Sequence, residues 1–130
     1  MKYLLDSNAV IAMFKGNSRF LANLRAHHPQ DICISSIVVH ELFFGAYKSQ
    51  HKSQNLERVQ ALQFETLNFD RADAQHAGEL RALLAAAGTP IGPYDVLIAG
   101  QAMSRGLTLI TRNVREFQRA TGIAVEDWES

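Results

Sequence analysis

Three carboxylates stand near the ends of predicted strands or helices, and together they suit a divalent cation. Asp6 directly follows a short apolar run, Glu41 lies in the first turns after a second one, and Asp95 is the third residue of a predicted helix. Carboxylates that are brought together repel one another and raise each other's pKa unless a cation neutralises them. Oxygen ligands without cysteines or paired histidines favour Mg²⁺ or Mn²⁺ over zinc. The pattern predicts metal-assisted hydrolysis of phosphodiesters.

Further polar residues share the predicted edge and could support the three acids. Ser7 and Asn8 follow Asp6, and Asn113 and Glu116 follow a later apolar run. Asn113 and Glu116 also match a capping box, in which the third helical residue bonds back to the cap. For Asn113 we favour the capping role, whereas Glu116 suits the cap and the metal equally.

Each acid also has an ordinary structural interpretation. Asp6 alone is typical of a helix N-cap, and Asp95 alone favours the positive end of its helix. Glu41 alone is typical of a solvated helical glutamate, whose ion pairs contribute little. Because all three lie at comparable places in the pattern, we favour the shared metal site.

Strand-length apolar runs alternate with segments of helical period along the whole chain. Strands are predicted at residues 3–5, 32–34, 64–69, 107–111 and 123–125. Helices are predicted at residues 9–15, 18–26, 56–64, 71–87 and 93–105, after Ser35-Ser36, and after Asn113. This alternation predicts an α/β fold with a mostly parallel central sheet flanked by helices. Functional groups then gather at the carboxyl ends of the strands.

Length and composition indicate one domain over residues 1–130, because 130 residues with 47% hydrophobic content suffice for a single core. The 13 basic and 13 acidic side chains cancel, so any basic surface must be local. The single cysteine, Cys33, cannot form an internal disulfide. Neither a signal peptide nor a run of roughly 18 apolar residues is evident, and we expect a cytoplasmic protein without a membrane partner.

Four segments of the sequence match the motifs of a known protein family in their order and spacing. They are Leu5-Asp6-Ser7-Asn8, Ser36 with Glu41-Leu42 and Gly45, Pro93-Tyr94-Asp95 with Ile98-Ala99, and residues 107–113 with Glu116-Phe117. Over nearly its whole length the chain resembles PIN-domain ribonucleases of the VapC toxin type. The resemblance implies a single PIN-like domain and a Mg²⁺- or Mn²⁺-dependent endoribonuclease, with Asp6, Glu41 and Asp95 as catalytic metal ligands.

Two residues depart from the family pattern. Many PIN domains carry a fourth acid where this chain has Asn113, and most carry threonine where it has Ser7. The resemblance also implies the partners of such a toxin: a VapB-type antitoxin, a structured RNA resembling tRNA or rRNA, a second copy in a homodimer, and operator DNA contacted only through the antitoxin complex. The missing fourth acid leaves an alternative, a catalytically weak module that binds RNA or an antitoxin. A phosphoesterase acting on DNA is a third possibility.

Local cations near the acidic edge suit an RNA backbone, although a solvated surface explains each of them singly as well. They are Lys15, Arg19, Arg112, Arg115 and Arg119. The sequence shows no aromatic platform, which favours recognition of RNA shape over base stacking. A short apolar stretch has two interpretations, as core or as the contact for an antitoxin helix. Its residues are Val10, Ile11, Met13 and Phe14.

Overall fold

The computed structural model describes residues 1–120 and 122–130. Within these residues, five strands form one sheet in the order β3-β2-β1-β4-β5, and all neighbouring strands are parallel. The strands are β1 (Tyr3–Leu5), β2 (Ile32–Ser35), β3 (Glu65–Leu67), β4 (Thr108–Ile110) and β5 (Ala124–Glu126). The predicted parallel α/β fold is confirmed, with β3 and β4 shorter than their apolar patterns.

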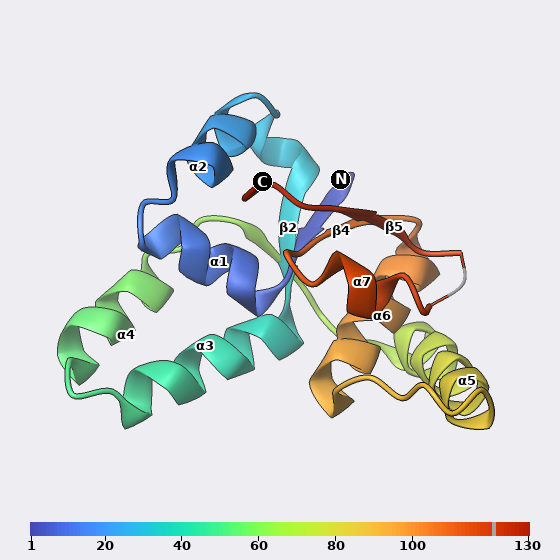
Figure 1. Ribbon diagram of the computed structural model, residues 1–130. Coiled ribbons are helices and arrows are strands. Elements are labelled where there is room, and N and C mark those ends of the chain that lie inside the picture. Colours follow the sequence, from blue (N-terminus) through green and yellow to red (C-terminus); the bar gives the residue numbers. More distant parts are fainter. Residues whose placement is uncertain (121) are drawn as a thin grey trace.

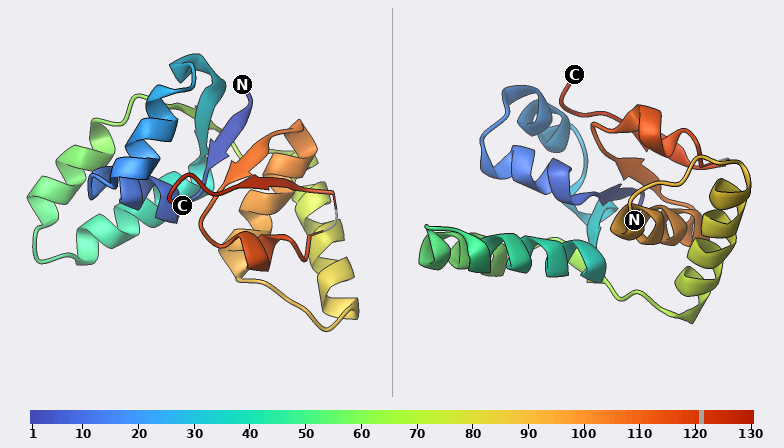
Figure 2. Two further views of the ribbon diagram at one scale, coloured as in Figure 1. Left: turned by 45° about the horizontal axis from the view of Figure 1, so that its top comes forward. Right: turned by 60° about the horizontal axis from the view of Figure 1, so that its bottom comes forward.

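Helices flank the central strands on both sides. In Figures 1 and 2, α1 to α4 lie on one side of these strands and α5 to α7 on the other. The helices are α1 (Ser7–Phe14), α2 (Ser18–Arg25), η1 (Pro29–Asp31), α3 (Ser36–Lys48), α4 (Lys52–Gln60), α5 (Arg71–Ala86), α6 (Pro93–Arg105) and α7 (Val114–Phe117). None of the helices in the described residues is both long and apolar enough to cross a membrane.

Local residue chemistry explains several helix ends and one wrong prediction. Asp70 caps α5 within a capping box, and Gly106 ends α6 in the left-handed conformation that glycine adopts readily (φ 64°). The helix predicted at residues 56–64 instead begins at Lys52 and ends at Gln60. Its first turn consists of exposed polar residues, which an apolar period cannot detect.

The chain reverses its direction across the sheet at β1. It runs outward from β1 through β2 to β3, and then returns to β4 and β5 on the other side of β1. Ligands in open parallel sheets bind outside the carboxyl ends of the strands at such a reversal. Asp6 directly follows β1, and its N–H donates to the carbonyl of Ile110 at the end of β4 (3.0 Å). The fold therefore places Asp6 at the expected edge.

Candidate active site

Asp6 is buried at the carboxyl end of β1, with 3% of its surface exposed. Its Oδ1 accepts a hydrogen bond from the Ala9 N–H (2.8 Å), so the side chain caps α1. Burial raises its pKa to about 6, and the nearby charge of Asp95 adds to this effect, although hydrogen bonds from Thr111 and Ala9 oppose it. Capping uses one carboxylate oxygen, which leaves the other available to a ligand.

Asp95 enters the same edge from the first turn of α6. The pKa of Asp95 is raised to about 6, mainly by burial and to a lesser extent by the negative charges of Glu116 and Glu41. A Cβ on Gly92 would lie 2.9 Å from Asp95 Oδ2, so a larger residue at this position would displace the carboxylate. The charge of Asp95 acts on Asp6, and the charge of Glu41 acts on Asp95, so the three carboxylates lie within electrostatic range of one another although they come from separate elements.

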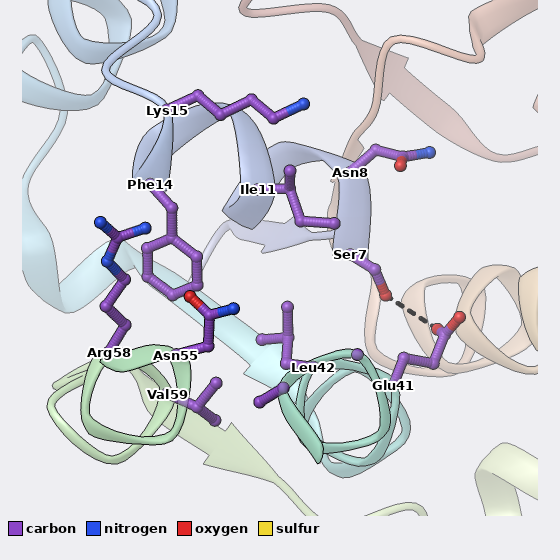
Figure 3. A pocket seen from close by; sticks show the side chains of 12 residues that line it. Ser7, Asn8, Ile11, Phe14, Lys15, Glu41, Leu42, Asn55, Arg58 and Val59 are labelled. Carbon is purple, nitrogen blue, oxygen red and sulfur yellow. Dashed lines mark hydrogen bonds between the residues drawn. The ribbon is translucent and has the colours of Figure 1, made fainter. Parts of the chain in front are cut away.

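Glu41 lies on α3, one and a half turns into the helix that follows β2. The Ser7 hydroxyl donates to Glu41 Oε1 (2.8 Å), which joins the start of α1 to α3 (Figure 3). Glu41 is half-buried, unlike the solvated glutamate of the ordinary structural interpretation. Its sequence context is that of any helical glutamate, and only the packing of α3 against α1 and α6 brings it to the edge.

The capping box predicted for Asn113 and Glu116 is absent in the described residues. Asn113 occupies the N-cap position of α7, but its side chain makes no capping hydrogen bond. Its N–H donates instead to the Thr111 hydroxyl (3.0 Å). Glu116 Oε1 accepts a hydrogen bond from the Gly92 N–H (3.3 Å), which brings α7 against the loop before α6. The charge of Glu116 acts on Asp95, and only the backbone N–H of Glu116 bonds to Asn113, whose carbonyl accepts it (3.1 Å).

The predicted RNA-contacting cations fall into separate places. One cleft of about 470 Å³ is lined by Arg112, Asn113, Arg115, Glu116 and Arg119. Lys15 lines a different cavity, between α1, α3 and α4. Arg19 is exposed on α2 and lines neither of these cavities. The structure thus groups the three arginines near α7 around Glu116, next to the acidic edge.

The cavity between α1, α3 and α4 is a groove of about 440 Å³ that starts at the acidic edge. Figure 3 shows Ser7, Asn8 and Glu41 at one end, and Arg58 at the other. Apolar side chains line the middle: Ile11, Phe14, Leu42, Ala46 and Val59. The apolar stretch of α1 was predicted to be either core or an antitoxin contact, and its residues differ in position. Val10 belongs to the core, whereas Ile11 is 38% exposed and lines the groove.

A divalent cation fits the chemistry of this edge. The available donors are carboxylate and hydroxyl oxygens, which Mg²⁺ and Mn²⁺ prefer. Burial is the main cause of the raised pKa values of Asp6 and Asp95, and the negative charges of neighbouring acids add to it. In residues 1–120 and 122–130, no three acidic, histidine or cysteine side chains form a ready-made ligand set. The edge is thus a concentration of repelling carboxylates and not a preassembled coordination shell.

Two polar side chains at this site escaped sequence reasoning. Thr111 lowers the pKa of Asp6, and Arg58 on α4 reaches the far end of the groove. Thr111 had a usable signal, because it directly follows β4 just as Asp6 directly follows β1. Arg58 had none, since its role depends on how α4 packs against α3 and α1.

Comparisons with known proteins agree with this architecture. The PIN domain family model matches residues 3–123. A tRNA(fMet)-specific endonuclease VapC from Salmonella typhimurium is 43% identical, with 98% of each chain covered. A protein of the same name from Shigella flexneri is 40% identical, again with 98% of each chain covered. The crystal structure of DNA-bound VapBC from Salmonella typhimurium matches with a TM-score of 0.92 and 41% identity, over 98% of each chain. The chain therefore belongs to the PIN-domain family and, within it, to the VapC ribonucleases.

Proposed function

We propose that this protein is a Mg²⁺- or Mn²⁺-dependent endoribonuclease and the toxin of a toxin–antitoxin pair. The observation that carries the proposal is the electrostatic coupling of Asp95 to Asp6 and to Glu41 beside the carboxyl edge of the sheet. Its membership of the VapC ribonucleases supports RNA as the substrate class. The relatives at 43% and 40% identity are named for cleavage of tRNA(fMet), which makes initiator tRNA the first substrate to test.

Each side chain at the edge has a distinct task in this proposal. The ion would be held by Asp6, Glu41 and Asp95. When bound, the ion supplies Lewis-acid activation for phosphodiester hydrolysis. Ser7 positions Glu41 through its 2.8 Å hydrogen bond. Many PIN domains have a fourth acid where this chain has Asn113. Glu116 would take the place of that acid, because its negative charge acts on Asp95. Asn8 lines the adjoining groove and is placed to contact substrate.

The experiment that tests this function compares nucleic acids under matched conditions. Purified protein is incubated with initiator tRNA, an elongator tRNA and single-stranded DNA of the initiator sequence, with Mg²⁺ or with EDTA. We expect cleavage of initiator tRNA in Mg²⁺ and none in EDTA. Equal cleavage in EDTA would contradict the metal requirement. RNA binding without cleavage would favour the regulatory module, and preferential cleavage of DNA would favour the third possibility.

The arginine cleft near α7 carries a separate prediction. Arg112→Ala and Arg115→Ala are each expected to weaken RNA binding and to reduce the slope of log affinity against log salt by about 1, because one phosphate contact is lost. Binding is measured in EDTA over a series of salt concentrations. Arg81→Ala, an exposed arginine on α5, is the control and should leave the slope unchanged. Unchanged slopes in both cleft variants would remove the cleft from the RNA path.

We also propose that the groove between α1, α3 and α4 receives the antitoxin. A complex of the 41% identical Salmonella toxin with its antitoxin is known. The groove offers an apolar middle to an amphipathic segment, with a carboxylate, Glu41, at one end and a cation, Arg58, at the other. An antitoxin segment placed there would also cover the Ser7–Glu41 end, which accounts for inhibition by occlusion.

Ile11 provides the test of this groove. Ile11→Lys is expected to weaken binding of the antitoxin by about thirtyfold, roughly 2 kcal/mol, because it places a charge in an apolar contact. Leu83→Lys is the control, since Leu83 is 60% exposed on α5, away from the groove. Calorimetry with purified antitoxin measures both affinities. Equal affinities for wild type and Ile11→Lys would exclude the groove as the antitoxin site.

A further inference from the structure

Two exposed aromatic rings flank the acidic edge. His40 on α3 directly precedes Glu41, and Tyr94 on α6 directly precedes Asp95. Their ring centroids lie 5.6 Å apart with an interplanar angle of 49°. Tyr94 is 45% exposed, and His40 is also exposed. We call this pair the aromatic shelf.

The shelf has no role in the hydrophobic core. Neither ring is among the side chains that form the core or pack against it. The two residues lie far apart in the sequence and meet only because α3 packs against α6. The sequence alone shows no aromatic platform, whereas the fold brings these two rings together.

Other exposed aromatic side chains on α3 differ from the shelf in position. Tyr47 is 60% exposed but lies six residues beyond Glu41, about 9 Å further along the helix axis. Lys48 Nζ lies over the Phe44 ring, 5.2 Å from its centre, so this ring already makes a cation–π contact. Among these described rings of α3 and α6, those of the shelf directly precede the acids of the proposed metal site in the chain.

We propose that the aromatic shelf stacks an unpaired base of the RNA substrate beside the phosphodiester that is cleaved. This inference rests on the proposed endoribonuclease function. Proteins that bind single-stranded RNA stack exposed bases on aromatic side chains. Every base can stack in this way, because every base has a π-face. A base adjoins its own phosphate, so a ring one residue away in the chain from an acid of the proposed metal site suits a nucleotide adjoining the reacting phosphate. The shelf thereby selects for a loop or another unpaired segment.

The test measures binding without cleavage. The probe is a fluorescein-labelled, 2′-O-methylated RNA of about 12 nucleotides, used single-stranded or annealed to its complement, in EDTA. Tyr94→Leu removes the π-face and keeps apolar volume, whereas Tyr94→Phe keeps the ring. Tyr47→Leu is the matched control on α3. Fluorescence anisotropy gives the affinities, and sedimentation gives the mass of each variant.

We expect Tyr94→Leu to weaken binding of the single strand by about tenfold, with no change for the duplex and no change in salt slope. Tyr94→Phe and Tyr47→Leu should bind like wild type. Equal single-strand affinities of Tyr94→Leu and wild type would overturn the shelf, as would equal losses in Tyr94→Leu and Tyr47→Leu. A halved mass for Tyr94→Leu with unchanged RNA affinity would assign the shelf to a contact between copies and also overturn it. Failure of the proposed function is distinct, because wild type would then leave RNA uncleaved in Mg²⁺, whatever the RNA affinities of the Tyr94 variants.

Discussion

Asp95→Asn is expected to abolish RNA cleavage and yet to stabilise the protein in the absence of divalent ions. Loss of a metal-holding carboxylate should lower the cleavage rate by about a thousandfold, which corresponds to ~4 kcal/mol in the barrier. The variant should melt a few degrees higher than wild type in EDTA at pH 7.5, since it removes a negative charge that burial destabilises and that Glu116 and Glu41 repel. Cleavage assays in Mg²⁺ and thermal melts in EDTA measure the two effects.

The pH dependence of this stabilisation follows from the raised pKa of Asp95, about 6 when folded against 3.8 for the ordinary group. Between these values the folded state binds more protons than the unfolded state, so the stability of wild type falls as pH rises. The advantage of Asp95→Asn should therefore grow from pH 4 to pH 7. Glu79→Gln, which neutralises an exposed acid on α5, is the control. An advantage that shrinks over this range would contradict the assigned electrostatics.

Asp73→Ala is expected to destabilise the fold strongly, by about 3 to 5 kcal/mol, because it leaves a buried network without its acceptor. The Asp73 side chain is 1% exposed and lies 3.0 Å from Arg105. It also accepts hydrogen bonds from Gln101 Nε2 (3.0 Å) and from the Asp70 N–H (3.0 Å). These contacts join α5 to α6, the helix that carries Asp95. Chemical denaturation measures the loss, and Glu79→Ala on the same helix should change stability little.

The contribution of Asp73 should disappear in acid. Burial alone would raise its pKa, but hydrogen bonds from Arg105, Asp70 and Gln101 hold the pKa at about 2. A lowered folded pKa means that the stabilisation is complete above about pH 4 and is lost as pH falls toward 2. The difference in stability between wild type and Asp73→Ala should shrink over that range. A difference that stays constant would show that the carboxylate charge does not stabilise the network.

Much of the fold was predictable from the sequence because its signals are local. Pro93 and Gly106 bound α6 at the predicted residues, since proline suits the first turn and glycine the left-handed end. The position of Asp6 was also predictable, because a polar residue that directly follows a parallel strand must lie at the carboxyl edge. The placement of the three acids needed both the parallel sheet and the family resemblance.

Features that depend on packing between distant elements could not be predicted. Glu116 matched a capping box, but the loop before α6 offers it the Gly92 N–H instead. His40 and Tyr94 lie far apart in the sequence, and only the contact between α3 and α6 pairs them. Spacing along one element determines which side chains share a face, whereas it does not determine which element that face meets.

The most direct test of the central claim is a measurement of Mn²⁺ binding. Calorimetric titration of Mn²⁺ into wild type should show saturable binding, with half-saturation near the Mn²⁺ concentration that half-activates RNA cleavage. The Asp6→Asn/Asp95→Asn double variant should show no such binding, while it remains folded because asparagine also caps helices. Mn²⁺ binding that is equal in wild type and the double variant would show that the carboxylate edge is not the metal site.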